Sequence, residues 1–159
     1  MNFESFADIK VLMDNFDPAT LLPDLTSMVG LVEFLTRIAV IIGPIVLLVM
    51  GILYFFASPK EANYIFGYRC YFGMGSEEAW RFTQRLAGLV WAALGLVLTI
   101  VMLIITGSFS GDPIMDIIGA GVKCLLWEIG LAAVSCLGIN LIAMIRYDRK
   151  GNRRNRDLY

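Results

Sequence analysis

Three long apolar stretches limit the folds open to this chain more than any other feature of its sequence. A helix needs about 20 predominantly apolar residues to cross the roughly 30 Å hydrocarbon core of a bilayer. The stretches Ile38 to Ala57, Leu86 to Gly107 and Cys124 to Ile145 are long enough. The first two contain no charged residue, and the third contains only Glu128. We therefore predict an all-α integral membrane protein with three transmembrane helices, at about 38–57, 86–107 and 124–145.

The composition agrees with a membrane protein and argues against an enzyme. Hydrophobic residues make up 58% of the chain, against roughly 45–50% in soluble domains. Histidine is absent, which removes the commonest general base and metal ligand. The three cysteines show neither a paired framework nor a zinc-ligand spacing. We expect a non-enzymatic protein with no catalytic residue, no cofactor and no metal.

The distribution of basic residues predicts how the chain crosses the membrane. Three spans place the two ends on opposite faces, and one face carries ten of the thirteen basic residues: Lys60, Arg69, Arg81, Arg85, Arg146, Arg149, Lys150, Arg153, Arg154 and Arg156. By the positive-inside rule that face is cytoplasmic. We predict a multi-pass cell-membrane protein with the N-terminus outside and the C-terminus in the cytoplasm. The N-terminal region is acidic, so no cleavable signal peptide is predicted.

Three regions follow from this topology. Residues 1–30 form an extracytoplasmic segment and linker, in which 3–16 have the spacing of a short amphipathic helix lying on the membrane surface. Residues 31–145 form the membrane domain, with a cytoplasmic loop at 58–85. Residues 146–159 form a basic cytoplasmic tail, which suits contact with anionic lipid better than nucleic acid because no aromatic ladder accompanies it.

The entry to the third span is expected to bend. A straight helix from the preceding proline would be roughly 50 Å long, well beyond the hydrocarbon core. We therefore expect residues 113–122 to form an interfacial helix that bends near Gly119 or Gly121. Glu128 would then lie near the start of the span, where it can pair with Lys123. Contact with an ion or ligand is the alternative role of this acid.

Small residues predict how the spans pack. Span two carries Gly88, Ala92, Gly95 and Thr99 on one face, which lets another helix approach closely. Matching positions occur in span one and span three: Gly43, Leu47, Gly51, Gly130, Ala133, Asn140 and Ala143. These residues suit packing within one chain, and assembly of a homo-oligomer is the alternative. Pro44 is expected to bend span one.

The second half of the cytoplasmic loop is explained by ordinary helix physics. Ser76 is placed as an N-cap, with acidic residues in the first turn that follows. Glu77 and Arg81 stand four residues apart in the favourable order for an ion pair. Trp80 and Phe82 would lie at headgroup level, as interfacial aromatic residues do.

The first half of the loop, "NYIFGYRCYFGMG", is less easily explained as a connector. It combines five aromatic residues, three glycines and Arg69 in a short space. One physical account is a re-entrant or interface-lying turn, with its aromatics among the headgroups. Arg69 would then bind phosphate or the exposed carbonyls of a helix end.

This loop also resembles the signature of the SdpI family of small bacterial membrane proteins. The family pattern has a proline, an asparagine, Gly-Tyr-Arg-Thr, a serine, a tryptophan, and an asparagine or histidine before Gly-Lys. The matching places are Pro59, Asn63, Gly67, Tyr68, Arg69, Ser76, Trp80 and Gly88, and the departures are Cys70, Gln84 and Leu89. The resemblance covers roughly residues 45–107.

The resemblance implies immunity to a secreted antimicrobial peptide or toxin, with or without signalling by holding a cytoplasmic repressor at the membrane. Its functional residues would be Asn63, Gly67, Tyr68, Arg69, Trp80 and Gln84, and Glu128 and Asn140 are the polar residues within the membrane. The expected partners are membrane lipids, a toxin peptide and a cytoplasmic regulator, but not nucleic acid. The alternative function is a small oligomeric transporter or an accessory subunit of a larger membrane complex.

Overall fold

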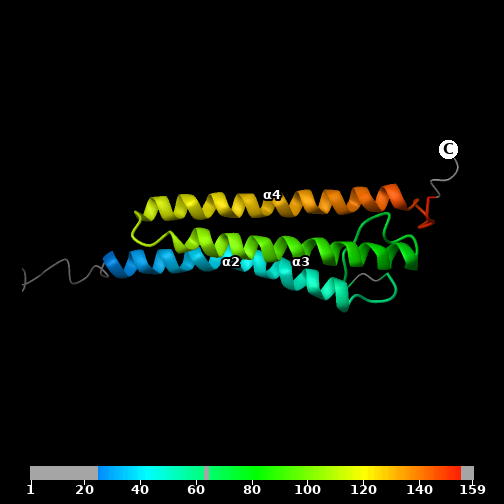
Figure 1. Cartoon of the computed structure of the whole chain (residues 1–159), viewed down its shortest axis with the longest axis horizontal. Coiled ribbons are helices and arrows are strands. Elements are labelled where there is room, and N and C mark those ends of the chain that lie inside the picture. The colour runs from blue at the N-terminus through cyan, green and yellow to red at the C-terminus, as the bar shows by residue number, and fades with distance from the viewer. Residues whose placement is uncertain (1–24, 63–64, 155–159) are drawn as a thin grey trace, which may run out of the picture.

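Three long helices lie side by side in the computed structural model, which describes residues 25–62 and 65–154 (Figure 1). They are α2 (Leu25–Phe56), α3 (Glu77–Gly107) and α4 (Ile114–Arg146). Each is long and apolar enough to cross a membrane, which confirms the predicted class and the three spans. The amphipathic helix predicted over 3–16 lies outside the described residues.

The surface of the bundle suits lipid rather than water. Only 22%, 22% and 17% of the most apolar windows of α2, α3 and α4 are buried inside the protein. The rest is a dense array of exposed leucine, isoleucine and valine side chains. An exposed apolar surface of this size is typical of a protein surrounded by hydrocarbon.

Helices α2 and α3 pack closely through the predicted small residues. A Cβ built on Gly88 would lie 2.6 Å from the backbone nitrogen of Phe55, and one built on Gly95 would lie 2.7 Å from Cα of Leu48. Gly51 faces the backbone of Ala92 in the same way. The backbones touch because no side chain separates them.

Pro44 lies inside α2 and is fully buried. In Figure 1 the second half of α2 runs at a slant to the first half. Such a change of direction is expected of a helix that contains proline, because its ring removes a backbone donor and crowds the preceding turn.

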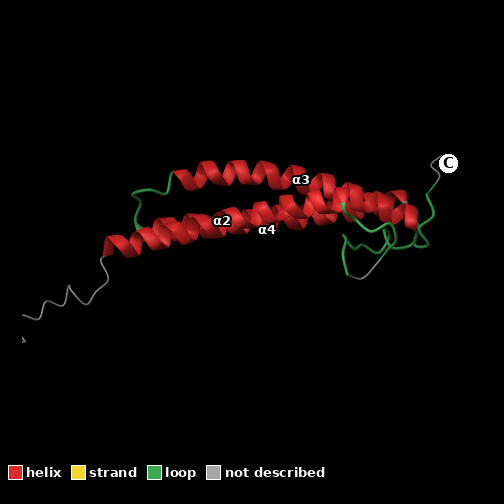
Figure 2. Cartoon of the chain, turned by 90° about the horizontal axis from the view of Figure 1, so that it is seen from below, coloured by secondary structure: helices red, strands yellow, loops and turns green. Residues whose placement is uncertain are grey.

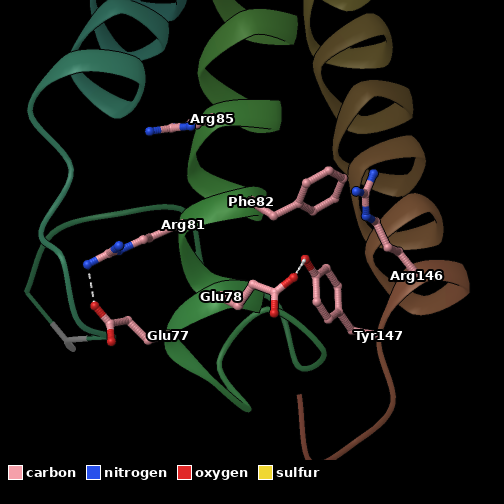
Figure 3. A pocket seen from close by; sticks show the side chains of 7 residues that line it. All are labelled: Glu77, Glu78, Arg81, Phe82, Arg85, Arg146 and Tyr147. Carbon is pink, nitrogen blue, oxygen red and sulfur yellow. Dashed lines mark hydrogen bonds and ion pairs between the residues drawn. The ribbon is translucent and has the colours of Figure 1, made fainter. Parts of the chain in front are cut away.

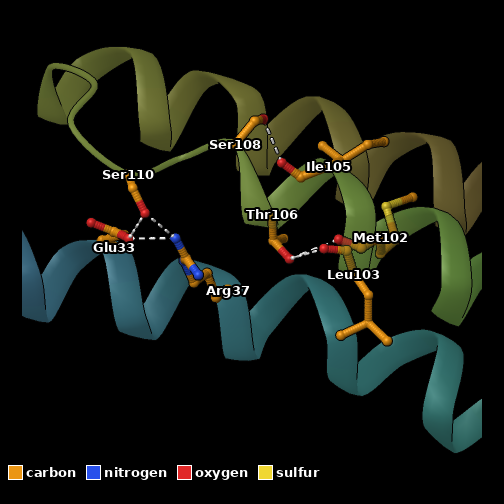
Figure 4. Close-up of polar contacts among 8 residues, drawn as sticks. All are labelled: Glu33, Arg37, Met102, Leu103, Ile105, Thr106, Ser108 and Ser110. Carbon is orange, nitrogen blue, oxygen red and sulfur yellow. Dashed lines mark hydrogen bonds and ion pairs between the residues drawn. The ribbon is translucent and has the colours of Figure 1, made fainter.

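The turn between α3 and α4 is fastened to α2. Arg37 donates to Glu33 of its own helix at 2.5 Å and to the hydroxyl of Ser110 in the turn at 2.7 Å (Figure 4). The Ser110 hydroxyl in turn donates to Glu33 at 3.2 Å. Phe109 beside it is 3% exposed. This polar cluster ties the turn to the first half of α2.

The opposite end of the bundle, here called the loop end, carries the α2–α3 loop and the turn that follows α4 (Figure 2). Just after α4 the chain folds into a tight turn over 147–154. In it Asp148 accepts from the backbone N–H groups of Lys150 and Asn152, each at 2.8 Å. These bonds hold the pKa of Asp148 below its usual value.

Helix α4 differs from its prediction, because it runs unbroken from Ile114 to Arg146. A separate interfacial helix near 113–122 is therefore wrong. Gly121 is a packing position rather than a bend, since a Cβ there would meet the side chain of Thr36 in α2. The contact with α2 therefore includes the first half of α4.

Candidate functional site

The signature loop, residues 57–76, enters the helix bundle. Its Tyr68 is 7% exposed. The Tyr68 hydroxyl donates to the carbonyl of Cys136 in α4 at 3.1 Å, and its ring meets Trp91 of α3 edge-on. Cys136 lies almost three turns before the end of α4, roughly 15 Å along its axis. The Tyr68 side chain thus reaches from the loop to α4, and the choice between a re-entrant and an interface-lying turn stays a prediction.

Gln84 of α3 holds the backbone of this loop. Its side-chain oxygen accepts from the N–H of Tyr68, and its side-chain nitrogen donates to the carbonyl of Tyr68, both at 2.7 Å. Gln84 is fully buried. The buried N–H and carbonyl of a residue both need hydrogen-bond partners, and here one amide side chain supplies both.

Gly67 allows the backbone to turn sharply just before Tyr68. Its φ is +124°, a conformation that side chains other than glycine's rarely adopt. A Cβ at this position would also lie 2.6 Å from the ring of Trp80. Gly67 is therefore required both for its backbone conformation and for the close approach of the tryptophan.

Trp80 is a structural residue rather than an interfacial one. It was expected at headgroup level, but it is fully buried, and its Nε1–H donates to the Pro59 carbonyl at 2.9 Å. The loop crosses over Trp80 and covers it. Phe82, which was expected at the same level, is partly buried beside the end of α4.

Ser76 is the N-cap of α3, as predicted, and accepts from the N–H of Ala79 at 3.2 Å. The same hydroxyl donates to the Gly151 carbonyl at 2.7 Å. Glu77 and Arg81 form the predicted ion pair. The cap of α3 is thereby joined to the turn that follows α4.

Two ionisable side chains of the loop are shielded from water. Burial raises the pKa of the Tyr68 hydroxyl, and it also raises the pKa of the Cys70 thiol. The Cys70 sulfur accepts from the N–H of Gly73 at 3.2 Å. Both groups therefore stay protonated at neutral pH, and their hydrogen bonds are structural.

Arg69 follows Tyr68 along the chain and is exposed. It borders a groove of about 450 Å³ between the loop and α4, together with Tyr71 and Asn140. Leu141 and Met144 supply apolar lining. The Oδ1 atom of Asn140 is buried and has no hydrogen-bond partner among the described residues. The groove is thus bordered by a guanidinium, an amide and apolar walls.

Glu128 lies apart from this groove, near the middle of α4. It is 8% exposed, and a Cβ built on Gly43 of α2 would lie 2.6 Å from its Oε2. Its Oε1 has no hydrogen-bond partner among the described residues. The expected pairing with Lys123 does not form, since Lys123 is exposed and the described ion pairs are elsewhere. The longer, straight helix places this acid deeper than the sequence suggested.

The structure therefore separates the sequence-predicted residues into three groups. Gly67, Tyr68, Trp80 and Gln84 meet in one buried brace, Arg69 and Asn140 share the groove, and Glu128 is alone between α2 and α4. Asn63 lies outside the described residues. No cluster of three or more potential metal ligands occurs within residues 25–62 and 65–154.

Sequence reasoning missed the basic pocket formed by Arg85 and Arg146 with Phe82 between them. Both arginines stand at the edge of a charge-poor apolar stretch, and that position was the available signal. They are close together because the start of α3 lies beside the end of α4. A pattern of neighbouring residues does not contain this information.

The comparison with protein families finds a match over residues 60–145 to the SdpI/YfhL protein family. The match includes the third span, so the likeness extends further along the chain than the loop and span two alone suggested. The searches of curated proteins and of solved structures find no match.

Proposed function

This chain belongs to the SdpI/YfhL protein family, and from that premise we propose that it protects its cell against a secreted antimicrobial peptide or toxin. It does so as a non-enzymatic multi-pass membrane protein. Signalling through a cytoplasmic repressor, alone or together with protection, is part of the same proposal. The observation that carries it is the groove between Arg69 and Asn140.

The chemistry of the groove suits a peptide. A peptide backbone presents an N–H donor and a carbonyl acceptor at short intervals. The Asn140 amide would pair with one of these backbone groups, and the Arg69 guanidinium would take a carbonyl or carboxylate. The leucine and methionine walls would contact apolar side chains of a membrane-active peptide.

The test is protection of a sensitive strain against a panel of secreted antimicrobial peptides, including any encoded beside this protein. We expect the wild-type chain to raise the inhibitory concentration of its cognate peptide. Arg69→Ala should return that concentration to the empty-vector value while the protein stays in the membrane fraction. Arg149→Ala removes an exposed arginine away from the groove and should keep protection.

Two further variants identify what Arg69 and Asn140 do. Arg69→Lys keeps the charge but loses the planar fork, so it should also lose most of the protection. Asn140→Leu removes the amide and should weaken protection without lowering membrane levels. A fully active lysine variant would mean that Arg69 contributes only its positive charge and not the geometry of its guanidinium. Failure of the wild type against every cognate peptide would exclude immunity.

A second function, a small oligomeric transporter or an accessory subunit, is favoured by the open face of α4. A Cβ on Gly130 or Gly138 would meet nothing within 4 Å, so these small residues have no partner helix within the described chain. Native mass measurement in lipid nanodiscs separates the two functions. A monomer supports immunity, and a stable oligomer supports the transporter or subunit.

A further inference from the structure

A second pocket lies at the loop end and shares no lining residue with the signature loop's groove. It has a volume of about 460 Å³ and lies between the first turns of α3 and the end of α4 (Figure 3). Three arginines line it, Arg81 and Arg85 from α3 and Arg146 from α4. It therefore concentrates positive charge from two helices in one hollow.

The acidic residues of this pocket already have partners. Glu77 is ion-paired with Arg81, and Glu78 accepts from the Tyr147 hydroxyl at 3.3 Å. Neither Arg85 nor Arg146 forms an ion pair with a carboxylate among the described residues. Two guanidinium groups thus remain to bind an anion from outside the protein.

Arg146 is held in place by an aromatic ring. Its guanidinium carbon lies 4.3 Å from the centroid of the Phe82 ring, a cation–π contact. Figure 3 shows Phe82 reaching from α3 toward Arg146, and Arg85, one turn further along α3, extending on the opposite side of the helix. The contact orients the guanidinium, which also interacts with the Tyr147 hydroxyl.

The charges are arranged by depth. Arg85 directly precedes the charge-free stretch of α3, and Arg146 directly follows the apolar stretch of α4. Glu78 lies seven residues before Arg85, which is roughly 10 Å nearer the water along the helix. The arginines therefore lie where hydrocarbon meets headgroup, while the acids face the aqueous side.

We propose that this pocket binds the phosphate group of an anionic phospholipid. Arg85 and Arg146 donate to the phosphate oxygens from two sides, and Phe82 contacts the glycerol region between them. The acyl chains lie along the exposed apolar side chains of α3 and α4. This site is separate from the Arg69 groove and does not depend on the proposed immunity function.

The experiment measures phosphatidylglycerol retained by the full-length chain, by native mass spectrometry from detergent micelles over a lipid titration. The wild type should bind phosphatidylglycerol more tightly than zwitterionic phosphatidylcholine. The double variant Arg85→Gln/Arg146→Gln should weaken phosphatidylglycerol binding at least about tenfold, since each basic residue at the surface contributes to attraction of anionic lipid. Circular dichroism confirms that the variant keeps its helices.

Three comparisons decide the proposal. The matched variant Arg149→Gln/Lys150→Gln removes the same charge from the exposed turn and should leave binding within about twofold. An equal loss in this control would mean general electrostatic attraction and would overturn the site. Displacement of the lipid by millimolar inorganic phosphate would assign the pocket to a soluble phosphate compound instead. The double variant Arg85→Lys/Arg146→Lys keeps the charge, and full binding by it would exclude recognition by the guanidinium geometry.

Discussion

At the scale of single residues, the family signature combines two physical tasks. Two of its positions shape the buried loop: Gln84, which stands where the family has asparagine or histidine, pairs with the backbone of Tyr68, and Gly67 leaves room for the Trp80 ring. Arg69 differs, because its side chain is exposed beside a groove. A loop that enters a bundle needs internal partners for its peptide groups, since hydrocarbon offers none. The brace is therefore what allows Arg69 to be presented at a fixed position.

Gln84→Leu tests the brace directly. Leucine has a similar size, but it leaves the N–H and the carbonyl of Tyr68 buried without partners. Each unpaired group costs about 1–3 kcal/mol, so we expect the free energy of unfolding to fall by about 2–4 kcal/mol. Equilibrium unfolding in mixed SDS micelles measures this. Leu89→Ala, on the exposed side of the same helix, should change it by less than about 1 kcal/mol. A Gln84→Leu variant as stable as its control would contradict the brace.

At the scale of helices, α2 and α3 form a tight pair, whereas α4 has a more open surface. Gly51, Gly88 and Gly95 bring the backbones of α2 and α3 into contact. Gly130 and Gly138 of α4 face open space within the described chain. The same residue type therefore has opposite consequences on different helices, and a substitution can distinguish them.

Gly95→Ala should destabilise the protein, because its Cβ would lie 2.7 Å from Cα of Leu48 and backbone cannot easily move aside. We expect a loss of about 1–3 kcal/mol, the usual cost of overpacking. Gly130→Ala adds the same methyl group where nothing lies within 4 Å and should be neutral or stabilising by up to about 1 kcal/mol. Thermal unfolding of both variants in the same detergent makes the comparison. Equal effects would mean that the α2–α3 contact is not the cause.

The sequence predicted the features that depend on near neighbours along the chain. Span positions follow from apolar length, the Ser76 cap from its place before two acids, and the α2–α3 contact from small residues at helical spacing. The features that the sequence did not predict depend on contacts between segments that are distant along the chain. Trp80 is buried because Pro59 and the loop cover it, and Tyr68 bonds a residue 68 positions away. No window of sequence contains those pairings.

The depth of Glu128 shows the same limit. We predicted a bend before this residue, because an unbroken helix would be longer than the hydrocarbon core is thick. The structure instead extends α4 beyond the core at its ends. The acid then lies beside Gly43, where α2 has no side chain to exclude it. A length argument alone could not choose between bending a helix and letting it protrude.

At the scale of the whole molecule, the two ends of the bundle differ in chemistry. One end is closed by the cluster of Glu33, Arg37 and Ser110. The loop end carries the signature loop, the Arg69 groove, the pocket lined by Arg85 and Arg146, and the basic turn after α4. Because most of the basic residues gather at the loop end, we expect that end to face the cytoplasm. Each proposed site then depends on this orientation.

Thiol labelling in intact spheroplasts tests the orientation. Asp112→Cys places an exposed thiol in the α3–α4 turn, and Lys150→Cys places one in the turn after α4. A membrane-impermeant maleimide should label Asp112→Cys at once and Lys150→Cys only after lysis, because ten of the thirteen basic residues hold the loop end inside. The wild type measures the background from the three native cysteines. Cys70 and Cys124 are buried, Cys136 is partly buried within the apolar helix α4, and burial raises the pKa of the Cys70 thiol, which leaves little reactive thiolate. Labelling of Lys150→Cys before lysis would reverse the orientation and place the Arg69 groove and the phosphate pocket outside the cell.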